Sequence, residues 1–390
     1  MTTSSLIIGK TALQASQLAL QVTGNNIANA TTPGYSRQRA EQVVTASQEV
    51  QRGVFVGRGV GVQEVRRLVD EALQTRVRSA TSDEMAASVS ASIMDSIESI
   101  TNELSGNDIS TRLEEFFNAF SELANNPAQS VTRAAVLETT GRLTGQIQAI
   151  RSDFVELRDQ VDADIRATVE EVNGLLSRIA KLNDQIVDSE AGAGENPGLR
   201  DQRDALLDEL SQQIDIAVIP QDTGAVRVLV GSEPLVEGER YRELRVNEQF
   251  NPTTEMIEFE VRTVDDGTTI FPSGGRLGAL IDERANSVQR NIDELDTFAA
   301  QLIFEVNRLH SQGRPDIGLT SASSSLGVPA ADQILALNDP ANLTFSNLPM
   351  QANNGSFPVV VTDSNGNRDV TIVDIDLDGI LAGGGAGFTD

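Results

Sequence analysis

Residues 6–37 of this chain read LIIGKTALQASQLALQVTGNNIANATTPGYSR, and the rest of the sequence is organised around this stretch. Leu6, Leu13, Leu20 and Ile27 recur every seven residues, and further apolar side chains recur every three or four positions beside them. This spacing predicts a helix with a wide apolar face. The Asn, Thr, Pro and Gly residues that follow end the helix, because Asn and Gly tolerate left-handed backbone and Pro cannot continue a helix.

A helix this apolar at a chain end needs partners, because terminal segments fray unless other groups hold them. We expect those partners to be other subunits, so the helix and the turn after it form a predicted assembly interface. The residues assigned to this interface are Leu6, Leu13, Leu20, Ile27, Asn25, Asn26, Asn29, Thr32, Pro33, Gly34, Tyr35 and Arg37.

The composition limits the classes of partner. The 390 residues include 57 acidic and 30 basic side chains, which gives a formal charge of −27. This balance argues against nucleic acid, whose binding depends on Lys and Arg that neutralise phosphates, and against anionic membrane surfaces. Aromatic residues make up 4% of the chain and Trp is absent, so Ala, Val, Ile and Leu must do most of the packing, as in helical bundles.

The chain contains no Cys, which excludes disulfides and thiolate chemistry. Either Cys is simply scarce here, or the protein crosses an oxidising boundary unfolded and must not crosslink on the way. No stretch of about 20 uncharged apolar residues could span a membrane, so we predict no membrane insertion. The start, Met-Thr-Thr-Ser-Ser, lacks the basic residues of a cleavable signal. The protein therefore either stays in the cytoplasm or leaves by a route without signal cleavage.

The most regular apolar pattern runs from residue 128 to about residue 189. Spacings of four and three alternate, except for two consecutive fours at Val161, between Leu157 and Ile165, which form a stutter. A continuous helix over this segment is roughly 90 Å long and cannot lie inside a compact domain, so it predicts a rod. The positions are Val136, Thr140, Leu143, Ile147, Ile150, Phe154, Leu157, Val161, Ile165, Thr168, Val172, Leu175, Ile179, Leu182 and Ile186.

Shorter segments complete the organisation. We expect an extended segment over 38–66 with a strand near Val60–Val65, and further helices over 68–78, 84–104, from a Ser110 cap onward, and 200–213. Alternating apolar residues predict a β insertion over about 214–272. The three/four spacing returns over 277–309, in a helix expected to pair antiparallel with the long one, and strands are expected at 358–361 and 370–375.

The predicted fold class is mainly α with β insertions. We expect an elongated multi-domain rod, in which a coiled-coil-like bundle of long helices carries small β domains. Its parts are residues 1–37, the assembly helix and turn; 38–313, the bundle with its β insertion; and 314–390, the start of a β-rich outer domain. Because the sequence stops in a Gly-rich run at 383–387, we expect this outer domain to be truncated.

The sequence motifs do not favour catalysis. The single His, His310, ends a helical pattern, where a surface position is the simpler interpretation, and one His cannot build a zinc motif or a triad. Gly57, Gly59 and Gly61 alternate, but the third Gly is one position early for the dinucleotide fingerprint and no Lys-Ser/Thr follows. A flexible strand or bulge is therefore expected there.

Acidic residues are the remaining candidates. Asp374, Asp376 and Asp378 begin like a calcium loop, but the twelfth position is Gly385 in place of the closing Glu. A solvated acidic strand is therefore favoured over a weak cation site. The acidic side chains of the long helix, which we expect to be solvated and paired with Arg, are Asp153, Glu156, Asp159, Asp162 and Asp164. We predict no enzyme activity, no cofactor and no metal.

Four stretches carry a family resemblance. Leu20 to Arg37 resembles the N-terminal signature of bacterial flagellar axial proteins, the rod, hook and hook-associated group, and Gly59-Val-Gly-Val62 leading to Arg66 and Asp70 resembles the strand that follows it. Within that group, LRDQRDALLDELS at 199–211 and GGRLG at 274–278, together with 299–313, are similar to the hook-associated protein 1 (FlgK) family. The signature is shared by many axial proteins, but the four stretches in this order are specific. They cover about residues 1–313.

The resemblance implies a structural subunit at the junction between hook and filament, needed for filament assembly. Its implied partners are further copies of itself, hook protein, the filament-side junction protein and an export chaperone. The implied location is outside the cell, after export through the flagellar type III route without signal cleavage. Members of the family share a C-terminal amphipathic helix that pairs with the N-terminal one. Nothing in this sequence matches that helix, so we expect it to be absent.

Two alternatives stay open. One is another flagellar axial protein, such as hook protein or the filament-side junction protein, although the third and fourth stretches weigh against it. The other is a cytoplasmic coiled-coil scaffold, which predicts retention in the cell.

Overall fold

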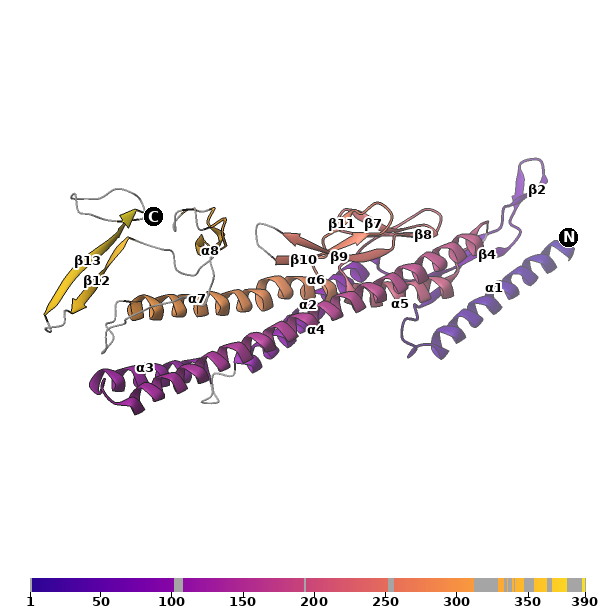
Figure 1. The fold of residues 1–390 in the computed structure, drawn as a ribbon. Coiled ribbons are helices and arrows are strands. Elements are labelled where there is room, and N and C mark those ends of the chain that lie inside the picture. The colour runs from indigo at the N-terminus through magenta and orange to yellow at the C-terminus, as the bar shows by residue number, and fades with distance from the viewer. Residues whose placement is uncertain are drawn as a thin grey trace. The chain divides into compact units, whose positions relative to one another are not determined.

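A computed structural model describes residues 2–101, 108–192, 194–251, 256–311, 329–332, 335, 339, 341–346, 354–362, 367–376 and 388–389. The chain divides into two compact units, Met1–Ile292 and Asp293–Asp390. Helices dominate the described residues and small, mostly antiparallel sheets interrupt them, which confirms the mainly α class with β insertions (Figure 1). Residues 105–107, Gly313 and Pro315, which we expect from the sequence to end helices, lie outside the described residues, as does the Gly-rich run at 383–387.

The first unit begins with a helix that lies on a β ribbon. Helix α1 spans Thr2–Ala28, and strand β1 (Gln38–Val44) pairs antiparallel with β4 (Val60–Arg67). At the far end of this ribbon, β2 (Gln48–Gln51) and β3 (Val54–Val56) form a second hairpin. Because α1 contacts both β1 and β4, the ribbon covers one face of the helix (Figure 1).

The next four helices are α2 (Glu71–Thr101), α3 (Ile109–Asn125), α4 (Ser130–Glu190) and α5 (Pro197–Gln213). Helix α4 confirms the predicted long helix, with 61 residues that extend roughly 90 Å. Its predicted apolar positions are buried except for Thr140 and Leu182, which are half-buried.

Helix α2 is one continuous helix where the sequence predicted two, so the predicted break was wrong. Residues 79–83, Ser-Ala-Thr-Ser-Asp, are polar, but they contain neither Gly nor Pro. Their small side chains let another segment come close. A Cβ built on Gly274, just before α6 (Gly275–Glu283), would lie 2.9 Å from Ser82 Oγ. Within this run, the buried Ser82 is therefore a close-packing position of α2.

Helix α3 is capped by Asp108, so the predicted Ser110 cap was wrong. The Asp108 carboxylate accepts hydrogen bonds from the Thr111 backbone N at 2.7 Å and from the Thr111 hydroxyl at 3.0 Å. Asp and Ser are about equally good N-caps. The sequence therefore offered two candidates two residues apart, and propensity alone could not choose between them.

The predicted β insertion folds as two small sheets, of which several strands contact α4. The first sheet orders β5 (Ala217–Pro220), β6 (Val226–Val230), β7 (Glu233–Glu237) and β8 (Arg240–Tyr241), and the second orders β11 (Thr269–Ile270), β10 (Met256–Thr263) and β9 (Leu244–Asn251). Two asparagines of α4 form hydrogen bonds to the backbones of these two sheets. The Asn183 amide bonds to both Val226 N and Val226 O, at 3.1 and 2.8 Å, and Asn173 does the same for Leu244, at 2.8 Å each. These amides pair backbone groups that would otherwise be buried without partners.

The stutter of α4 lies beside a π-helical turn of the helix packed against it. Helix α6 continues into η1 (Arg284–Gln289) and α7 (Arg290–Ser311). The sequence predicted that the helix over 277–309 pairs with the long helix, and contacts with α4 are made by its first part, α6 and η1. Asp162, one residue after the stutter position, was predicted to be solvated, but it is buried and pairs with Arg284. A π turn inserts one residue into a helix. The stutter of α4 and the π turn η1 therefore lie against each other. The ion pair between Asp162 and Arg284 is buried at this contact.

The second unit contains the rest of α7, the short helix α8 (Leu343–Ser346) and a sheet. That sheet orders β12 (Gly355–Thr362), β13 (Arg368–Asp376) and β14 (Phe388–Thr389), with β12 and β13 antiparallel. The two strands predicted at 358–361 and 370–375 are confirmed and extend a few residues further at their ends.

Candidate assembly surface

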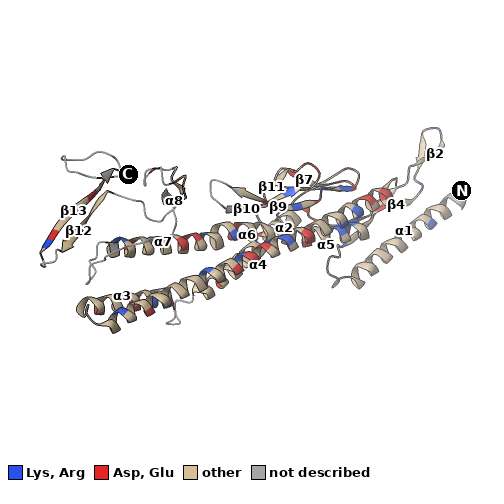
Figure 2. Ribbon diagram, viewed as in Figure 1, with Lys and Arg blue, Asp and Glu red and all other residues tan. Residues whose placement is uncertain are grey.

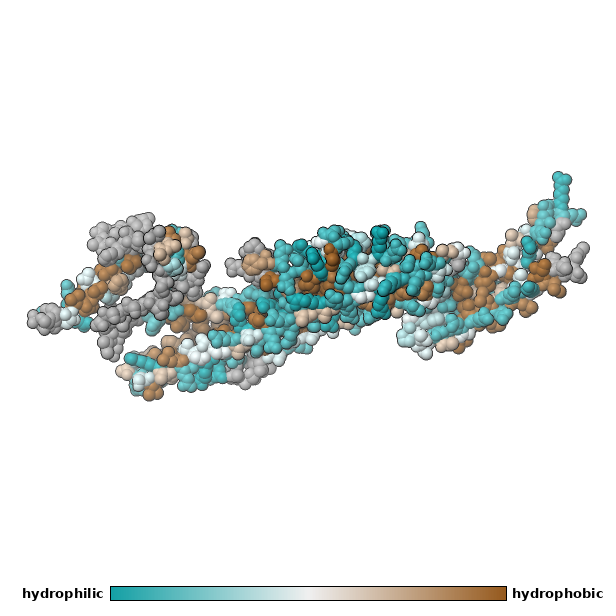
Figure 3. All heavy atoms as spheres, turned by 45° about the vertical axis from the view of Figure 1, so that its right-hand side comes forward, coloured by the Kyte–Doolittle hydropathy of each residue, from teal (hydrophilic) through white to brown (hydrophobic). Residues whose placement is uncertain are grey.

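Helix α1 leaves one face open. The apolar stripe consists of Leu6, Leu13, Leu20 and Ile27, which are 73–77% exposed. The opposite face is closed, since Ala15 and Val22 are buried. Lys10 is the one charged residue between Thr2 and Ala28, and α1 is accordingly almost uncoloured by charge in Figure 2. Figure 3 shows apolar side chains gathered over the N-terminal elements, at the right, whereas the bundle beside them is largely hydrophilic.

The turn after α1 is held by its own side chains. Asn26 Oδ1 accepts hydrogen bonds from the Tyr35 hydroxyl at 2.8 Å and from Gln38 N at 2.9 Å, and Asn26 Nδ2 donates to Gln38 O at 2.8 Å. Asn29 Nδ2 donates to Asn25 Oδ1 at 2.8 Å. The conformation at Gly34 is left-handed, with φ of 76°, which suits Gly. The amide side chains thus close the loop between α1 and β1 and fix the direction in which α1 leaves the ribbon.

The predicted interface residues therefore fall into two groups. The apolar four point to solvent, whereas Asn26, Asn29 and Tyr35 are partly buried inside the turn. Of the others, Asn25, Thr32, Pro33, Gly34 and Arg37 are exposed. The Thr32 hydroxyl donates to Asn29 Oδ1 at 3.3 Å, and Arg37 O accepts from Leu68 N at 2.8 Å.

The turn also contacts helix α5, far away in the sequence. Ser36 N donates to Asp201 Oδ2 at 3.2 Å, and a Cβ at Gly34 would lie 3.7 Å from the Ala205 Cβ. Arg67 of β4 binds Asp201 at 2.9 Å and Asp204 at 2.7 Å through the same Nη1. Three of the stretches singled out in the sequence meet here: the terminal signature, the strand leading from Gly59, and the segment at 199–211. The sequence marked each stretch but gave no sign that they meet.

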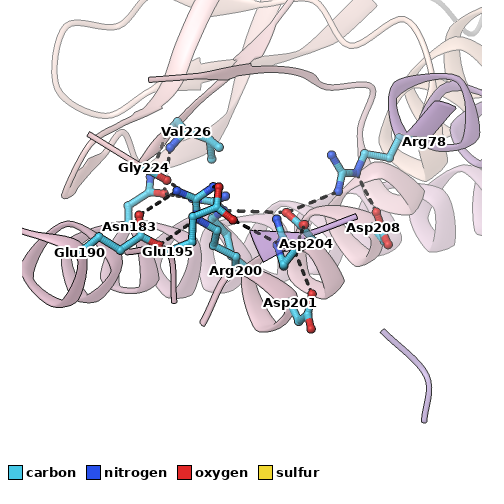
Figure 4. Close-up of polar contacts among 12 residues, drawn as sticks. Arg78, Asn183, Glu190, Glu195, Arg200, Asp201, Asp204, Asp208, Gly224 and Val226 are labelled. Atoms are coloured by element: carbon cyan, nitrogen blue, oxygen red, sulfur yellow. Dashed lines mark hydrogen bonds and ion pairs between the residues drawn. The ribbon is translucent and has the colours of Figure 1, made fainter. Parts of the chain in front are cut away.

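A larger network of charges surrounds this contact (Figure 4). Arg78 of α2 binds Asp208 at 2.7 Å, and Arg200 binds Glu190 at 2.7 Å and Glu195 at 3.1 Å. Arg203 Nη1 donates to the carbonyl of Gly224 at 2.7 Å and to Asn183 Oδ1 at 3.3 Å. The network joins α2, α4, α5, β4 and the start of the β insertion. It is therefore a support for the N-terminal elements on the bundle.

A cavity of about 230 Å³ beside the network is lined by Arg67, Arg78, Arg200 and Arg203, among other residues. Four arginines around one cavity could bind an anion if their charges were not already paired. Each guanidinium, however, already faces a carboxylate or a carbonyl. The carboxylates around them are Glu190, Glu195, Asp201, Asp204 and Asp208. Because five carboxylates surround four arginines, the positive charge is fully offset and the set carries a net charge of −1. We therefore assign the network a structural role.

Burial and charge act in opposite directions within the network. Burial lowers the pKa of Arg67, but Asp204 and Asp201 together outweigh it, so the net pKa is raised. Burial lowers the pKa of Arg203 to about 10, with Asp204 as an opposing charge; its Nε lies 3.9 Å from Asp204 Oδ1. Burial raises the pKa of Glu190, but the hydrogen bonds from Arg200 and from Asn196 N and the charge of Arg200 outweigh it, so the net pKa is lowered.

The Glu190 carboxylate predicts a loss of stability in acid. Its folded-state pKa lies below the ordinary value of 4.5. Its contribution is therefore present above pH 4.5 and is lost as pH falls through the folded-state pKa. We expect the free energy of unfolding of Glu190→Gln, measured by urea denaturation, to depend less on pH between about 5 and 3 than that of the unchanged protein. Glu239→Gln, at an exposed site, should keep the full dependence, and equal slopes for the two variants would contradict the assignment.

The remaining motifs have plain structural positions. His310 is exposed in the last turn of α7, which confirms the surface interpretation. Gly59 has φ of 103°, and a Cβ there would lie 3.4 Å from Ile8 Cα, so this Gly permits close contact between the ribbon and α1. Asp374 lies on β13, whereas Asp378 and Gly385 are outside the described residues. In the part of the chain that the structure describes, none of the helices combines the length and apolarity needed to cross a membrane.

Two family models match the sequence. Residues 6–35, which include the apolar stripe and most of the turn, match the model described as "Flagella basal body rod protein". Residues 94–320, more than half of the chain, match the model described as "Flagellar hook-associated protein FlgK helical domain". The chain therefore belongs to the FlgK family of flagellar hook-associated proteins.

Curated relatives agree with this assignment. Flagellar hook-associated protein 1 of Escherichia coli (strain K12) is 28% identical over 312 residues, which are 77% of this chain and 56% of that protein. The protein of the same name from Bacillus subtilis (strain 168) is 32% identical over 220 residues, 55% of this chain and 43% of that protein. The chain thus spans about half the length of the relatives it matches. A solved structure, the flagellar hook junction protein FlgK from Burkholderia pseudomallei, aligns with a TM-score of 0.48 and 24% identity over 55% of this chain and 39% of that one.

Proposed function

We propose that this chain is a structural subunit of the bacterial flagellum that forms the junction between hook and filament and is needed for filament assembly. It acts without catalysis, outside the cell, after export through the flagellar type III route without signal cleavage. Its partners are further copies of itself in a ring-like helical layer, hook protein on one side, the filament-side junction protein on the other, and an export chaperone before assembly.

The observation that carries this proposal is the apolar stripe of α1. Four large apolar side chains are 73–77% exposed on a helix with one charge. Exposed apolar surface of this kind marks an interaction site. The position of α1 on the bundle is fixed, because the turn and β4 bind α5 through Asp201 and Asp204. Membership in a hook-associated family supports the assignment of this surface to contacts within the flagellum.

The mechanism we propose is geometric. Subunits above and below the junction belong to different lattices, so the contacts must tolerate a mismatch. Apolar burial is non-directional, which lets the stripe slide by small amounts against its neighbours without breaking hydrogen bonds. The hydrogen-bonded turn around Asn26 and Tyr35 keeps the direction of α1 constant while the stripe adjusts.

A double substitution in the stripe tests the proposal. Leu13→Asp with Leu20→Asp places two charges on exposed positions, so folding and export should be kept while axial contacts fail. We expect the variant in its host bacterium to reach the culture medium as a folded protein and to leave cells without filaments, counted by electron microscopy. Leu137→Asp, at a 74% exposed Leu on α4, is the matched control and should build filaments. Normal filaments in the double variant would contradict the proposal.

A further inference from the structure

The helix that runs from α6 through η1 into α7 carries a regular apolar repeat, but it is not a regular helix. Every seventh residue is apolar, and the repeat passes through the π turn without interruption; its members are Ile281, Val288, Leu295, Leu302 and Leu309. In an uninterrupted α-helix, seven residues return to nearly the same face, with a drift of about 20°. A π turn inserts one residue, which rotates the helix after it by about 100° around its axis. The sequence spacing therefore describes one rotational phase of the helix, and the structure shows another.

The burial of α6 follows the phase with the π turn. Leu277 and Leu280 are buried before the turn, whereas Ile281, the member of the repeat, is only half-buried. Val288, the next member of the repeat, is fully buried inside η1. The two parts of the repeat are therefore rotated against each other at η1, and Leu280 takes the core position that the spacing assigns to Ile281.

Arg284 ties the π turn to α4 and to the β insertion. It is the first residue of η1, its side chain is 8% exposed, and it pairs with Asp162 of α4. Its Nη1 donates to the carbonyl of Ile257 at 3.0 Å, and its guanidinium lies over the Phe259 ring, 4.1 Å from the centroid. Because π turns are rare in helices, these contacts at the start of η1 are the interactions that hold the turn in place.

We propose that the pair between Asp162 and Arg284 selects the phase with the π turn, and that without this pair the helix takes the uninterrupted phase of its repeat. Replacing a buried charged pair by apolar groups is often neutral for stability, and the best-attested role of such groups is to fix register. The pair borders a cavity of about 360 Å³, which leaves room for the Arg284 side chain to leave Asp162. The helix is then an element with two packings, in which Arg284 is the positioning residue. This inference goes beyond the proposed function, which does not depend on it.

The double variant Asp162→Leu with Arg284→Met tests the proposal, because it removes the pair without leaving a buried charge. In its crystal structure we expect α-helix without a π turn over 275–311. The residues after position 289 should be rotated by about 100° relative to α6, and Ile281 should become as buried as Val288. A π turn that persists in the double variant would overturn the proposal.

Arg276→Ala is the matched control, because it removes a pair between α6 and α4 that is half exposed, the pair with Asp164. The control should keep the π turn and the burial of α6 as they are. Loss of the π turn in the control would show that the turn responds to any change between the two helices, and this result also contradicts selection by the buried pair.

Hydrogen exchange gives a second reading in solution. The amides of residues 288–291 should exchange about tenfold more slowly in the double variant, because they then form the regular bonds of an α-helix. Asp162→Asn keeps the shape of the side chain and removes its charge, so it is the milder second variant and should slow the same amides by about threefold. Unchanged exchange at these amides in both variants would overturn the proposal, and this result leaves the proposed function untouched.

Discussion

Replacing Arg67 with alanine is expected to lower the free energy of unfolding by about 3–5 kcal/mol, the usual cost of removing one partner from a buried ion pair. One nitrogen of Arg67 binds both Asp201 and Asp204, whose side chains are only 11% and 13% exposed. Without the guanidinium, two carboxylates stay close together with little water to solvate them. The same change weakens the contact between the turn and α5, because Ser36 N shares Asp201.

Urea denaturation gives the free energy, and hydrogen exchange locates the loss. We expect Ser36 and the neighbouring amides of β4 to exchange faster in Arg67→Ala, while amides in the middle of α4 change less. Arg66→Ala is the matched control, because Arg66 is the exposed neighbour on the same strand, and it should shift the free energy by no more than about 0.5 kcal/mol. Equal effects of the two substitutions would show that the network does not support the N-terminal elements.

The second large effect is expected at the matched irregularities of α4 and η1. Arg284 binds Asp162, donates to the Ile257 carbonyl at 3.0 Å and stacks over the Phe259 ring at 4.1 Å. Arg284→Ala should cost about 3–5 kcal/mol in the free energy of unfolding, measured in urea, because Asp162 is left buried and unpaired. Substituting both, as Arg284→Met with Asp162→Leu, should recover most of that loss, since apolar groups of similar size can replace a buried pair.

Arg276 provides the control for this pair. It lies on α6, just before η1, and faces Asp164 of α4 at 3.6 Å, but both side chains are about half exposed, at 41% and 55%. Exposed pairs contribute about 0–1 kcal/mol, so Arg276→Ala should be nearly neutral. If Arg276→Ala and Arg284→Ala cost the same, burial does not distinguish the two pairs and the argument fails.

The long helix and the β insertion could be predicted because apolar residues recur in each at a regular spacing, of three or four residues in the helix and of two in the strands. The spacing over 128–189 matches α4 to within two residues at each end, and the alternating runs at 226–230 and 257–261 fall within β6 and β10. Burial of one face of a helix or strand requires such spacing, so the spacing can be read directly from the sequence.

Other features depend on contacts between distant residues, which periodicity does not encode. The sequence predicted separate helices over 68–78 and 84–104, but α2 is continuous, and the close approach of Gly274 accounts for the small side chain at Ser82. Asp162 was predicted to be solvated because it lies outside the regular apolar positions of α4. Its burial is explained by its pairing with Arg284, 122 positions later in the chain. The π turn of η1 has no signal of its own in the sequence.

The candidate site shows the same division. The seven-residue spacing of Leu6, Leu13 and Leu20 indicated one shared face, and this face is exposed. Its role as an interface stays a prediction. The assignment of the turn residues to the interface stays a prediction. Their division into a hydrogen-bonded group around Asn26 and an exposed group could not be predicted from the sequence. The contacts of this turn with Asp201, and of Arg67 with Asp201 and Asp204, were not predicted, although the segments involved had been singled out.

The central claim is that this chain is the structural link between hook and filament, and its position on the isolated organelle tests that most directly. Hook–filament structures sheared from the host bacterium can be labelled with an antibody against the exposed β insertion and viewed by electron microscopy. We predict label in one narrow band at the boundary between the curved hook and the straight filament. Label distributed along the filament or the hook, or label confined to the cell fraction, would contradict the account.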